Sequence, residues 1–452
     1  MFYKTLSKPL VGKTLMAFSA VMFISPAVFA ETLEQSVASA LTQHPQVESA
    51  IAAVNAAEQG QKEQYSAYFP SLEVNATGGR IFGDNSTSRG LSVTRGEGYS
   101  YLWEGSVAAR QLIFDGLETK NRVSSARAEA EAAEYSLADV RGTLAFQTTQ
   151  TYVNLMRTQV GLALLLGQEK SVNDYLSRIE GMVEDGAADE AELQQAKDVS
   201  VILDNFIADY EGQARTLEAD YFELTGHLPE NGLEMPVIIE GQIPENVDEA
   251  IQSAKDAHPL LNAAQMQSQS AKHEMEAEKS TYAPQFNGEL SYLKSDKDDI
   301  IGGEVEDGKA VVRMNWGFET GGAQKARIQQ RTYEYKQAMA RIAEVERQVE
   351  RGVRQAYSEL ETAKKQLANQ KRRHDLNKKL FETYQIQFEG ALISVLQLMQ
   401  ADNQVLLTKL ETSNAQSRVL LAQYSVLAAM GQLQNALNIK VASTHEQIRR
   451  QK

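Results

Sequence analysis

Cysteine is absent from the 452 residues, and only nine residues are proline. Without cysteine the chain cannot form a disulfide framework, and it cannot carry a lipid anchor on an N-terminal cysteine. Proline is the residue that interrupts helices most strongly, so its shortage permits long uninterrupted helices. Ala, Gln and Glu are abundant instead, which is a composition typical of long helices.

Clustered basic residues and long apolar runs are also missing from the body of the chain. The formal net charge is −15, which argues against nucleic acid as a partner because phosphate binding needs grouped Lys and Arg. Beyond the N-terminus, no stretch is apolar enough to predict a transmembrane helix. The six histidines are scattered, and no metal-ligand spacing, nucleophile turn or phosphate-binding loop occurs. We therefore expect no enzyme, no cofactor and no metal site.

The first thirty residues are typical of a secretory signal peptide. Three lysines precede a largely apolar stretch from Leu15 to Val28, and Val28 and Ala30 are small residues at −3 and −1 of a cleavage site before Glu31. An N-terminal membrane anchor is the less favoured alternative, because the apolar stretch is shorter than the roughly 20 residues of a membrane span. We expect residues 1–30 to be removed on export.

A long sequence pattern occurs twice in the chain. The stretch 44–70 opens on His-Pro and closes on Pro, and so does the stretch 258–284, which begins 214 residues later (258 − 44). Tyr152 and Tyr357 are a further matching pair, but they are 205 residues apart (357 − 152). The first half therefore holds extra residues, and the Gly-, Ser- and Thr-rich stretch 81–98 is where we place them, since repeats absorb insertions in loops.

The predicted domain organisation follows from this duplication. A first structural repeat at 31–226 and a second at 248–438 are joined by a linker at 227–247, which holds three of the nine prolines, and a C-terminal tail follows at 439–452. Each repeat is predicted to contain a helix, a β-hairpin and a long helical hairpin. The β-hairpins are predicted at 72–114 and 286–318, and the long helical hairpins at 119–226 and 322–438.

Apolar and polar residues alternate with a period of two in the predicted strands. The clearest apolar series are Leu72, Val74 and Ala76 in the first half, and Val312, Met314, Trp316 and Phe318 in the second. An exported chain with such strands indicates an outer-membrane β-barrel, but four strands cannot close one. Open sheet edges in lipid leave backbone groups without hydrogen bonds, so several chains must share one barrel. The loops 82–101 and 295–309 would then face the exterior.

The stretches 119–185 and 323–388 contain no proline, and each predicts a helix of about 100 Å at 1.5 Å per residue. Apolar and small residues at steps of three and four form seams, which predict lengthwise helix packing. One seam consists of Ile342, Val345, Val349, Val353, Ala356, Leu360, Ala363 and Leu367, and the other of Leu406, Leu410, Ser413, Ser417, Leu420, Tyr424 and Leu427. These helices are too polar for lipid and are expected in the periplasm.

In its order of landmarks the mature chain resembles the TolC-type outer-membrane factors over its whole length. The resemblance lies in the duplication and in "YFPSL" (68–72) and "YAPQF" (282–286) before the strands. It continues in "LIFDG" (112–116) and "NWGFETGG" (315–322) before the long helices, and in the glycine turns at 184–196 and 388–403.

This resemblance implies a mostly α-helical fold with a transmembrane β portion: a homotrimer with a 12-stranded outer-membrane β-barrel, continued by a long periplasmic α-helical barrel. It implies a belt domain formed partly from 227–247 and the C-terminal end. It also implies a passive duct in the outer membrane of a Gram-negative bacterium. Its partners would be a periplasmic adaptor and an inner-membrane transporter, either ABC-type or proton-driven.

Two candidate sites are carried over from the family. Gly186 and Gly390 match the helix-turn glycines at the tunnel tip, where adaptor hairpins dock; the alternative is that each glycine only caps a helix in the left-handed conformation. Family members often carry a ring of carboxylates at the periplasmic constriction. In this chain Gln397 and Gln400 occupy the two acidic positions, so block by cations is in doubt, and Asp402 is a possible source of charge. Asp189, Glu190 and Glu192 beside the other turn are further possible sources, or simply a solvated acidic tip.

The favoured function is an exit duct for type I protein secretion, because many drug-pump ducts carry a lipidated cysteine and this chain has none. The cargo would be an exported protein such as a large adhesin or toxin. The first alternative is the outer-membrane channel of a multidrug efflux pump, which exports small molecules. The second is a periplasmic coiled-coil adaptor or scaffold, which two helical hairpins and paired amphipathic strands disfavour.

Overall fold

The computed structural model describes residues 30–83, 98–229, 232–236, 241–297 and 304–439. The predicted signal peptide, apart from Ala30, lies outside these described residues. So do most of the predicted loop 82–101, part of the loop 295–309, and the tail after Ile439.

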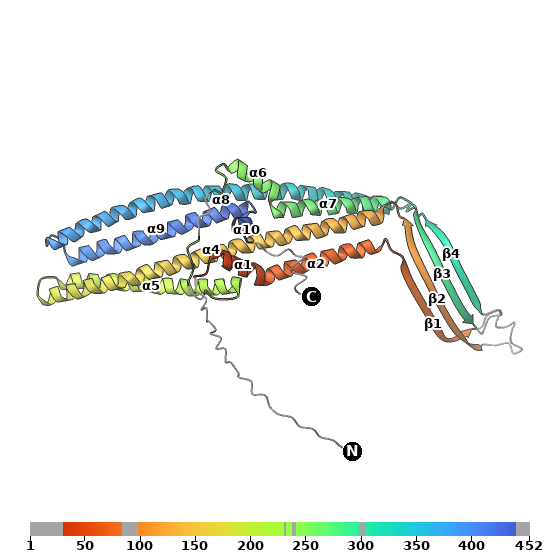
Figure 1. Cartoon of the computed structure of the whole chain (residues 1–452), viewed down its shortest axis with the longest axis horizontal. Helices are drawn as coiled ribbons and strands as arrows, with labels where there is room; N and C mark the ends of the chain where they lie inside the picture. The colour runs from red at the N-terminus through yellow and green to blue at the C-terminus, as the bar shows by residue number, and fades with distance from the viewer. Residues whose placement is uncertain (1–29, 84–97, 230–231, 237–240, 298–303, 440–452) are drawn as a thin grey trace, which may run out of the picture.

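The molecule is elongated, with an antiparallel sheet at one end and long helices over the rest of its length (Figure 1). The same order of elements occurs twice, as the internal repeat predicts. In the first half the elements are α1 (Leu33–Gln43), α2 (Pro45–Ser66), β1 (Ser71–Gly83), β2 (Gly98–Phe114), α4 (Glu118–Glu184) and α5 (Glu190–Thr225). In the second half they are α6 (Val247–Ala257), α7 (Pro259–Ser280), β3 (Gln285–Lys297), β4 (Val305–Asn315), α8 (Ala323–Glu389), α9 (Val395–Ala429) and α10 (Leu433–Ala436).

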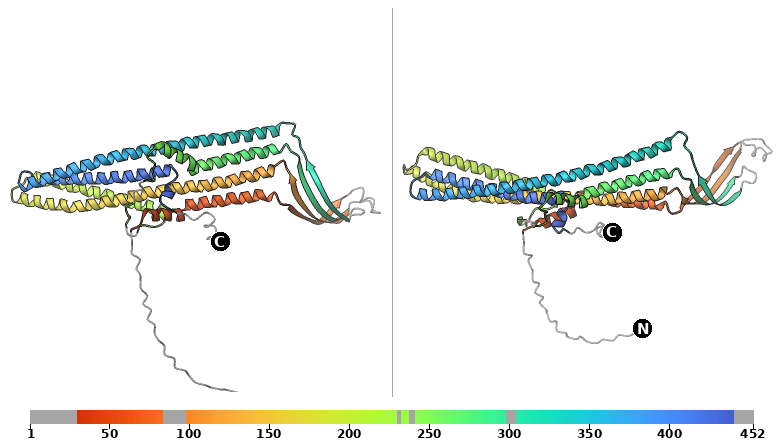
Figure 2. Two further views of the ribbon diagram at one scale, coloured as in Figure 1. Left: turned by 45° about the horizontal axis from the view of Figure 1, so that its top comes forward. Right: turned by 90° about the horizontal axis from the view of Figure 1, so that it is seen from above.

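Two helices of 67 residues, α4 and α8, run along the whole helical part. Each is about 100 Å long at 1.5 Å per residue, which confirms the length predicted from the missing prolines. Near the sheet, α8 contacts α7, α7 contacts α4, and α4 contacts α2. In the distal half, α8 contacts α9, α9 contacts α4, and α4 contacts α5 (Figures 1 and 2). The distal helices therefore form one layer whose two lateral edges are α8 and α5.

The repeated His-Pro pair marks a junction between two helices. His44 ends α1 and is the N-cap of α2, and its Nδ1 accepts a hydrogen bond of 3.2 Å from the amide of Gln46. His258 does the same between α6 and α7, accepting from Leu260 at 3.2 Å. Proline follows at the first helical position, where its missing N–H leaves no bond unmade. The sequence predicts one helix before each β-hairpin, so the short helices α1 and α6 that precede the His-Pro pairs were not predicted.

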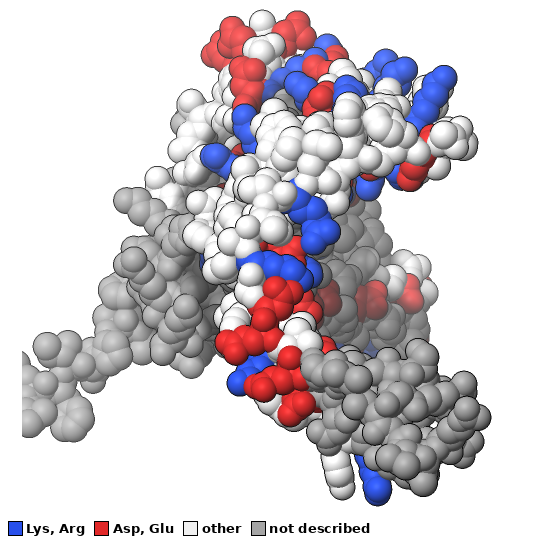
Figure 3. Space-filling model, turned by 90° about the vertical axis from the view of Figure 1, so that its right-hand side faces the viewer, with Lys and Arg blue, Asp and Glu red and all other residues white. Residues whose placement is uncertain are grey.

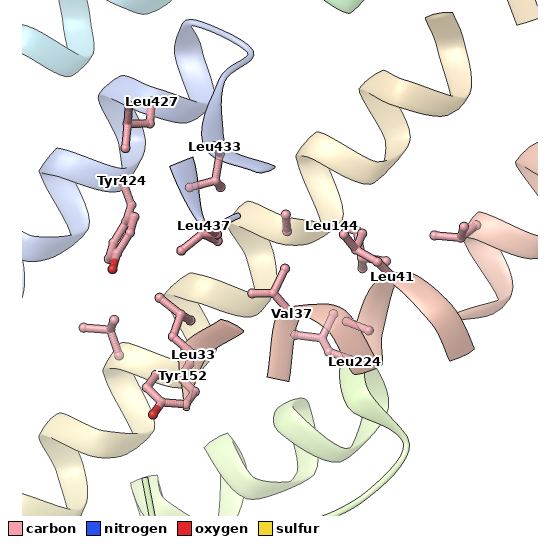
Figure 4. Close-up of a cluster of buried hydrophobic side chains, with 14 of the residues drawn as sticks. Leu33, Val37, Leu41, Leu144, Tyr152, Leu224, Tyr424, Leu427, Leu433 and Leu437 are labelled. Carbon is pink, nitrogen blue, oxygen red and sulfur yellow. The ribbon is translucent and has the colours of Figure 1, made fainter. Parts of the chain in front are cut away.

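The core is divided into three clusters along the rod. The middle cluster is built from α1, α2, α4, α5, α9 and α10 and contains Tyr152, Tyr221 and Tyr424 (Figure 4). A second cluster joins α8 to α6, α7 and α9, and a third lies at the distal end between α4, α5 and α9. The seam predicted on α8 is buried at six of its eight positions, and only Ile342 and Leu367 remain half-buried. The seam on α9 is likewise buried except at Ser413, which is half-buried.

The matching tyrosines of the two halves hold the chain segments that cross the middle of the rod. The hydroxyl of Tyr152 donates to the carbonyl oxygens of Glu31 and Glu234, at 2.7 Å and 2.6 Å. The hydroxyl of Tyr357 donates to the carbonyl oxygen of Pro244 at 2.7 Å. Burial raises the pKa of Tyr152, so the hydroxyl keeps the proton that it donates.

One predicted strand boundary is wrong. The alternation of apolar residues continues through Trp316 and Phe318, but β4 ends at Asn315. The register pairs Asn315 with Gln285, so if the pairing continued, Trp316 would lie opposite Pro284. Proline has no N–H to donate to a neighbouring strand, so the ladder stops there. Trp316 instead donates its Nε1–H to the carbonyl oxygen of Tyr282 at 3.1 Å.

Candidate functional site

The four strands lie in the order β1-β2-β3-β4, all antiparallel. Their register gives the sheet one mainly polar face and one mainly apolar face, on which charged residues occur toward the loop end: Arg80, Lys294, Asp296 and Glu306. Leu72 and Val312, 70% and 68% exposed, show how open the apolar face is. The exposed members of this face are Leu72, Val74, Phe82, Tyr101, Trp103, Val107, Leu290, Tyr292, Val312 and Met314. So large an exposed apolar surface marks contact with a membrane or another protein.

The opposite face of the sheet is polar and contains ion pairs. Arg110 lies 3.6 Å from Glu73, and Arg313 lies 3.2 Å from Glu289, each pair linking neighbouring strands. Viewed from the sheet end, acidic and basic side chains both reach the surface, with uncharged areas between them (Figure 3). A sheet with lipid-facing residues on one side and hydrated residues on the other has the pattern of a transmembrane barrel wall.

The sheet is open in the single chain. β1 and β4 each pair with one neighbour within the described residues, so one edge of each strand has unpaired backbone groups. Aromatic residues gather where the strands meet the helices, including Tyr65, Tyr68 and Phe69 before β1 and Trp316 and Phe318 after β4. Aromatic side chains of this kind are enriched where a membrane meets water.

The second candidate site is the distal tip, where two helical turns lie next to each other. The amide of Leu396, in the first turn of α9, donates to Glu192 of α5 at 3.3 Å, so the two turns are at the same level. Gly186 follows α4 with a φ of +70°, the left-handed conformation that favours glycine. The backbone conformation therefore favours glycine at this position, whatever else the turn contacts.

In the second turn, the residue with positive φ lies one position after Gly390, the glycine that the sequence matched to Gly186. Gly390 has a φ of −80°, which any residue adopts, and Ala391 carries the positive φ of 53°. Ala391, not Gly390, is the structural counterpart of Gly186, and the separation of 205 residues (391 − 186) equals that of the matching tyrosines. The left-handed cap is thus the right description of Gly186 and the wrong one for Gly390.

Gln397 and Gln400 are both exposed near the start of α9. Ser394 is the N-cap of this helix, and its side chain accepts from the amide of Gln397 at 3.3 Å. The Gln397 side chain accepts from the amide of Ser394 at 3.2 Å, which completes a capping box. Gln397 therefore has a structural role as an amide, while Gln400, one turn further, leaves its side chain in solvent.

Asp402 is half-buried between α9 and α4 rather than displayed at the tip. Its Oδ2 accepts from Nε2 of Gln168 at 2.9 Å and from the hydroxyl of Tyr175 at 3.3 Å. Burial and the neighbouring carboxylate of Asp402 raise the pKa of Tyr175 to about 12. The sequence contains no signal for this contact, because the partners are 227 and 234 residues away along the chain.

The acidic residues beside the first turn are partly committed to helix ends. Asp189 is the N-cap of α5, accepting from the amide of Ala191 at 3.3 Å, and Glu192 caps α9 as described above. Glu190 accepts from Gln194 at 2.8 Å on the exposed surface. Asp189 and Glu190 are both exposed, whereas Glu192 is half-buried.

Within the described residues, no group of three or more His, Cys, Asp or Glu side chains has the geometry of a metal site. None of the described helices has the length and hydropathy of a transmembrane segment.

The chain is similar in sequence to known outer-membrane proteins. The family profile "Outer membrane efflux protein" matches residues 37–227 and 250–432. The chain is 22% identical over 446 residues to "Outer membrane efflux protein BepC" of Brucella suis biovar 1, and the match covers 96% of this chain and 93% of that protein.

Solved structures with the same fold are also outer-membrane channels. The CmeC outer membrane channel of Campylobacter jejuni has a TM-score of 0.78 at 14% identity, covering 99% of this chain and 97% of that one. The outer membrane protein VceC of Vibrio cholerae has a TM-score of 0.74 at 15% identity, covering 88% and 96%. These likenesses show that the chain shares the fold of these proteins.

Proposed function

The chain belongs to the outer membrane efflux protein family, and from this premise we propose that three copies form the exit duct of a tripartite export machine. It is an outer-membrane channel protein rather than an enzyme, and its helical body lies largely in the periplasm. Membership in this family excludes the alternative that the protein is a periplasmic coiled-coil adaptor or scaffold. We further propose that the repeats 31–226 and 248–438 and the linker 227–247 are its structural divisions.

The observation that carries this proposal is the open, two-faced sheet. In lipid, each backbone group without a hydrogen bond costs several kcal/mol, so the free edges of β1 and β4 require partners. Three copies supply twelve strands, which is within the range of known barrels. The polar face with its ion pairs would then line the pore, and the exposed apolar face would contact lipid.

At the distal tip we propose that an adaptor docks on the turns containing Gly186 and Gly390, and that Gln397 and Gln400 surround the constriction. Asp402, the third residue expected at the constriction, is half-buried and would hold α9 against α4 there rather than face the opening.

Gly390 gives the cleaner test, because its φ of −80° tolerates any side chain. Gly390→Gln should impair export while trimers remain intact. A Cβ at Gly390 would make only ordinary van der Waals contacts, the nearest 3.5 Å from the carbonyl oxygen of Gln387, and Gly352→Gln, within α8 and with open space at its Cβ, is the control. Normal export by Gly390→Gln would refute docking at this position.

For the cargo we propose type I protein secretion, driven by an ABC transporter and its adaptor. The absence of cysteine supports this choice, because lipidated ducts are common among drug pumps. The second candidate is multidrug efflux, which the description of the Brucella suis relative as an efflux protein favours.

Deletion of the gene, followed by comparison of the secreted proteome and of drug sensitivity, tests both candidates. Protein secretion predicts that one or a few large proteins disappear from the medium while drug sensitivity is unchanged. Drug efflux predicts the reverse. A deletion strain unaltered in both respects would contradict the proposed duct.

A further inference from the structure

The two halves of the chain differ at the helix junction that each His-Pro pair marks. In the first half, Nε2 of His44 lies 3.2 Å from Oε1 of Glu223, and the His44 side chain is only 5% exposed. In the second half, His258 bonds through Nδ1 to the amide of Leu260, but no described residue bonds to its Nε2, and His258 is half-buried. The junction is therefore filled in the first half and open in the second.

The internal repeat explains this difference. Gly226 and Gly431 follow α5 and α9 with φ values of +79° and +70°. They are 205 residues apart (431 − 226), which is also the separation of the matching tyrosines. At this separation the counterpart of Glu223 is Ala428 (223 + 205). Because the alanine side chain ends at Cβ, the carboxylate that pairs with the histidine in the first half is missing from the second.

A cavity of about 710 Å³ lies at the open junction. α4 and α8 line it along their length, and the start of α7, the end of α9 and α10 contribute the remaining walls. Its volume is in the range of sites that hold small organic molecules. The lining residues that matter here are Asp139, Phe146, His258, Leu260, Glu359 and Ala428.

The cavity has two carboxylates and no cationic side chain to balance them. The carboxylates belong to Asp139 and Glu359, and neither lysine nor arginine occurs among the described residues that line the cavity. The first amides of α7 are not available to an anion, since that of Leu260 bonds to Nδ1 of His258 and that of Leu261 to its carbonyl oxygen. The cavity therefore favours a cation over an anion.

Asp139 is the carboxylate better placed to anchor a ligand. It is half-buried, and within the described part of the chain it forms neither a hydrogen bond nor an ion pair. Burial raises the pKa of Asp139 from its ordinary value, while the nearby His258 lowers it. Withdrawing a carboxylate from water without a partner costs free energy, and a bound cation would offset part of that cost. Glu359, in contrast, is exposed.

The lining suits an organic cation rather than a metal ion. The described residues contain no group of three or more His, Cys, Asp or Glu side chains that could hold a metal. Phe146, Leu260 and Val349 offer apolar contacts to the hydrocarbon part of a ligand. The ring of Phe146 is also a surface that a positive group can approach.

We propose that the cavity between α4, α7 and α8 binds a small organic cation. The positive group of the ligand pairs with the carboxylate of Asp139, and its hydrocarbon part contacts Phe146 and Leu260. Because Nδ1 of His258 accepts a hydrogen bond, the neutral imidazole carries its proton on Nε2, which can donate to a ligand oxygen or to water. This site goes beyond the proposed duct and depends neither on the number of copies nor on the cargo.

Benzamidine is the probe for this site, because its amidinium can pair with a carboxylate through two hydrogen bonds and its ring is apolar. Benzamide has nearly the same shape without the charge. Calorimetric titration of the detergent-extracted, unsubstituted mature protein should show one benzamidine bound per chain. Benzamide should bind at least about 10-fold more weakly, because it lacks the charge-assisted hydrogen bonds.

Three variants locate the binding. Asp139→Asn removes the charge with little change of shape and should weaken benzamidine binding at least about 10-fold. Asp174→Asn is the matched control, since it makes the same change at an exposed position 35 residues further along α4 (174 − 139), and it should bind like the unsubstituted protein. Ala428→Gln introduces a side chain of the length of Glu223 and should close the cavity while Asp139 remains.

Each contrary result overturns the site. No binding at about 10 mM benzamidine would do so, as would equal affinity for benzamidine and benzamide, or unchanged binding by Asp139→Asn. If Asp139→Asn loses its helical circular dichroism, Ala428→Gln decides instead, and unchanged binding by this variant would contradict the proposal. A protein that is monomeric in detergent would refute the duct, but it would leave this test of the cavity intact.

Discussion

Tyr152→Phe should loosen the middle of the rod by a measurable amount. The tyrosine is fully buried, and its hydroxyl donates to both Glu31 and Glu234. Glu31 keeps a second partner, since its carbonyl oxygen also accepts from the amide of Glu234 at 3.0 Å. Among the described residues, the carbonyl oxygen of Glu234 accepts only from Tyr152. Because Glu234 is exposed, water can replace part of this bond, and its loss costs about 0.5–1.5 kcal/mol, the net contribution of a typical hydrogen bond.

Native-state hydrogen exchange measures this cost at the amide of Glu234, which is bonded to Glu31. A loss of about 0.5–1.5 kcal/mol corresponds to exchange about 2-fold to 13-fold faster. Tyr357→Phe is the control, because it removes the single bond to Pro244 and leaves the bond from Tyr152 to Glu234 in place. Unchanged exchange at Glu234 in Tyr152→Phe, or an equal effect of Tyr357→Phe on the same amide, would refute this reasoning.

Three further predictions concern other parts of the chain. Gly116→Ala should lower the thermal stability of the trimer more than Gly322→Ala. Both glycines have positive φ, and forcing alanine into that conformation costs about 1–2 kcal/mol, but only at Gly116 would the new Cβ lie 2.4 Å from Ala283; equal losses would contradict this. Gln397→Asp with Gln400→Asp should make single-channel conductance sensitive to divalent cations, and no change would place the constriction elsewhere. Burial lowers the pKa of His258, so stability should fall as the pH drops below about 6.5, where the unfolded chain binds the proton first. His258→Asn keeps the helix cap and should remove this loss in acid unfolding, whereas persistence of the loss would assign it to another group.

Local sequence patterns predicted the long helices and the strands, but they did not predict where these elements end or the short helices between them. The missing prolines predicted α4 and α8, because a helix continues until a residue stops it. Period-two alternation predicted the strands, but it overran β4, since the alternation of Trp316 and Phe318 says nothing about the proline across from them. The short helices α1 and α6 were not predicted, because a His-Pro pair fits the start of the helix after it and gives no sign of a helix before it.

The candidate site shows the same division. The turn at the tip needs one residue with positive φ. The sequence match assigned this position to Gly390, but in the structure Ala391 occupies it. The capping role of Gln397 follows from its spacing after Ser394 and was available in the sequence. The burial of Asp402 against Gln168 and Tyr175 could not be predicted from the sequence, because it depends on how α4 packs against α9.

The central claim is that lipid-facing strands from separate copies complete one wall. The mass of the detergent-extracted mature assembly, measured by native mass spectrometry, tests it most directly. The account predicts a single species of three copies. A stable monomer, or an assembly whose strand number cannot close a barrel, would contradict it.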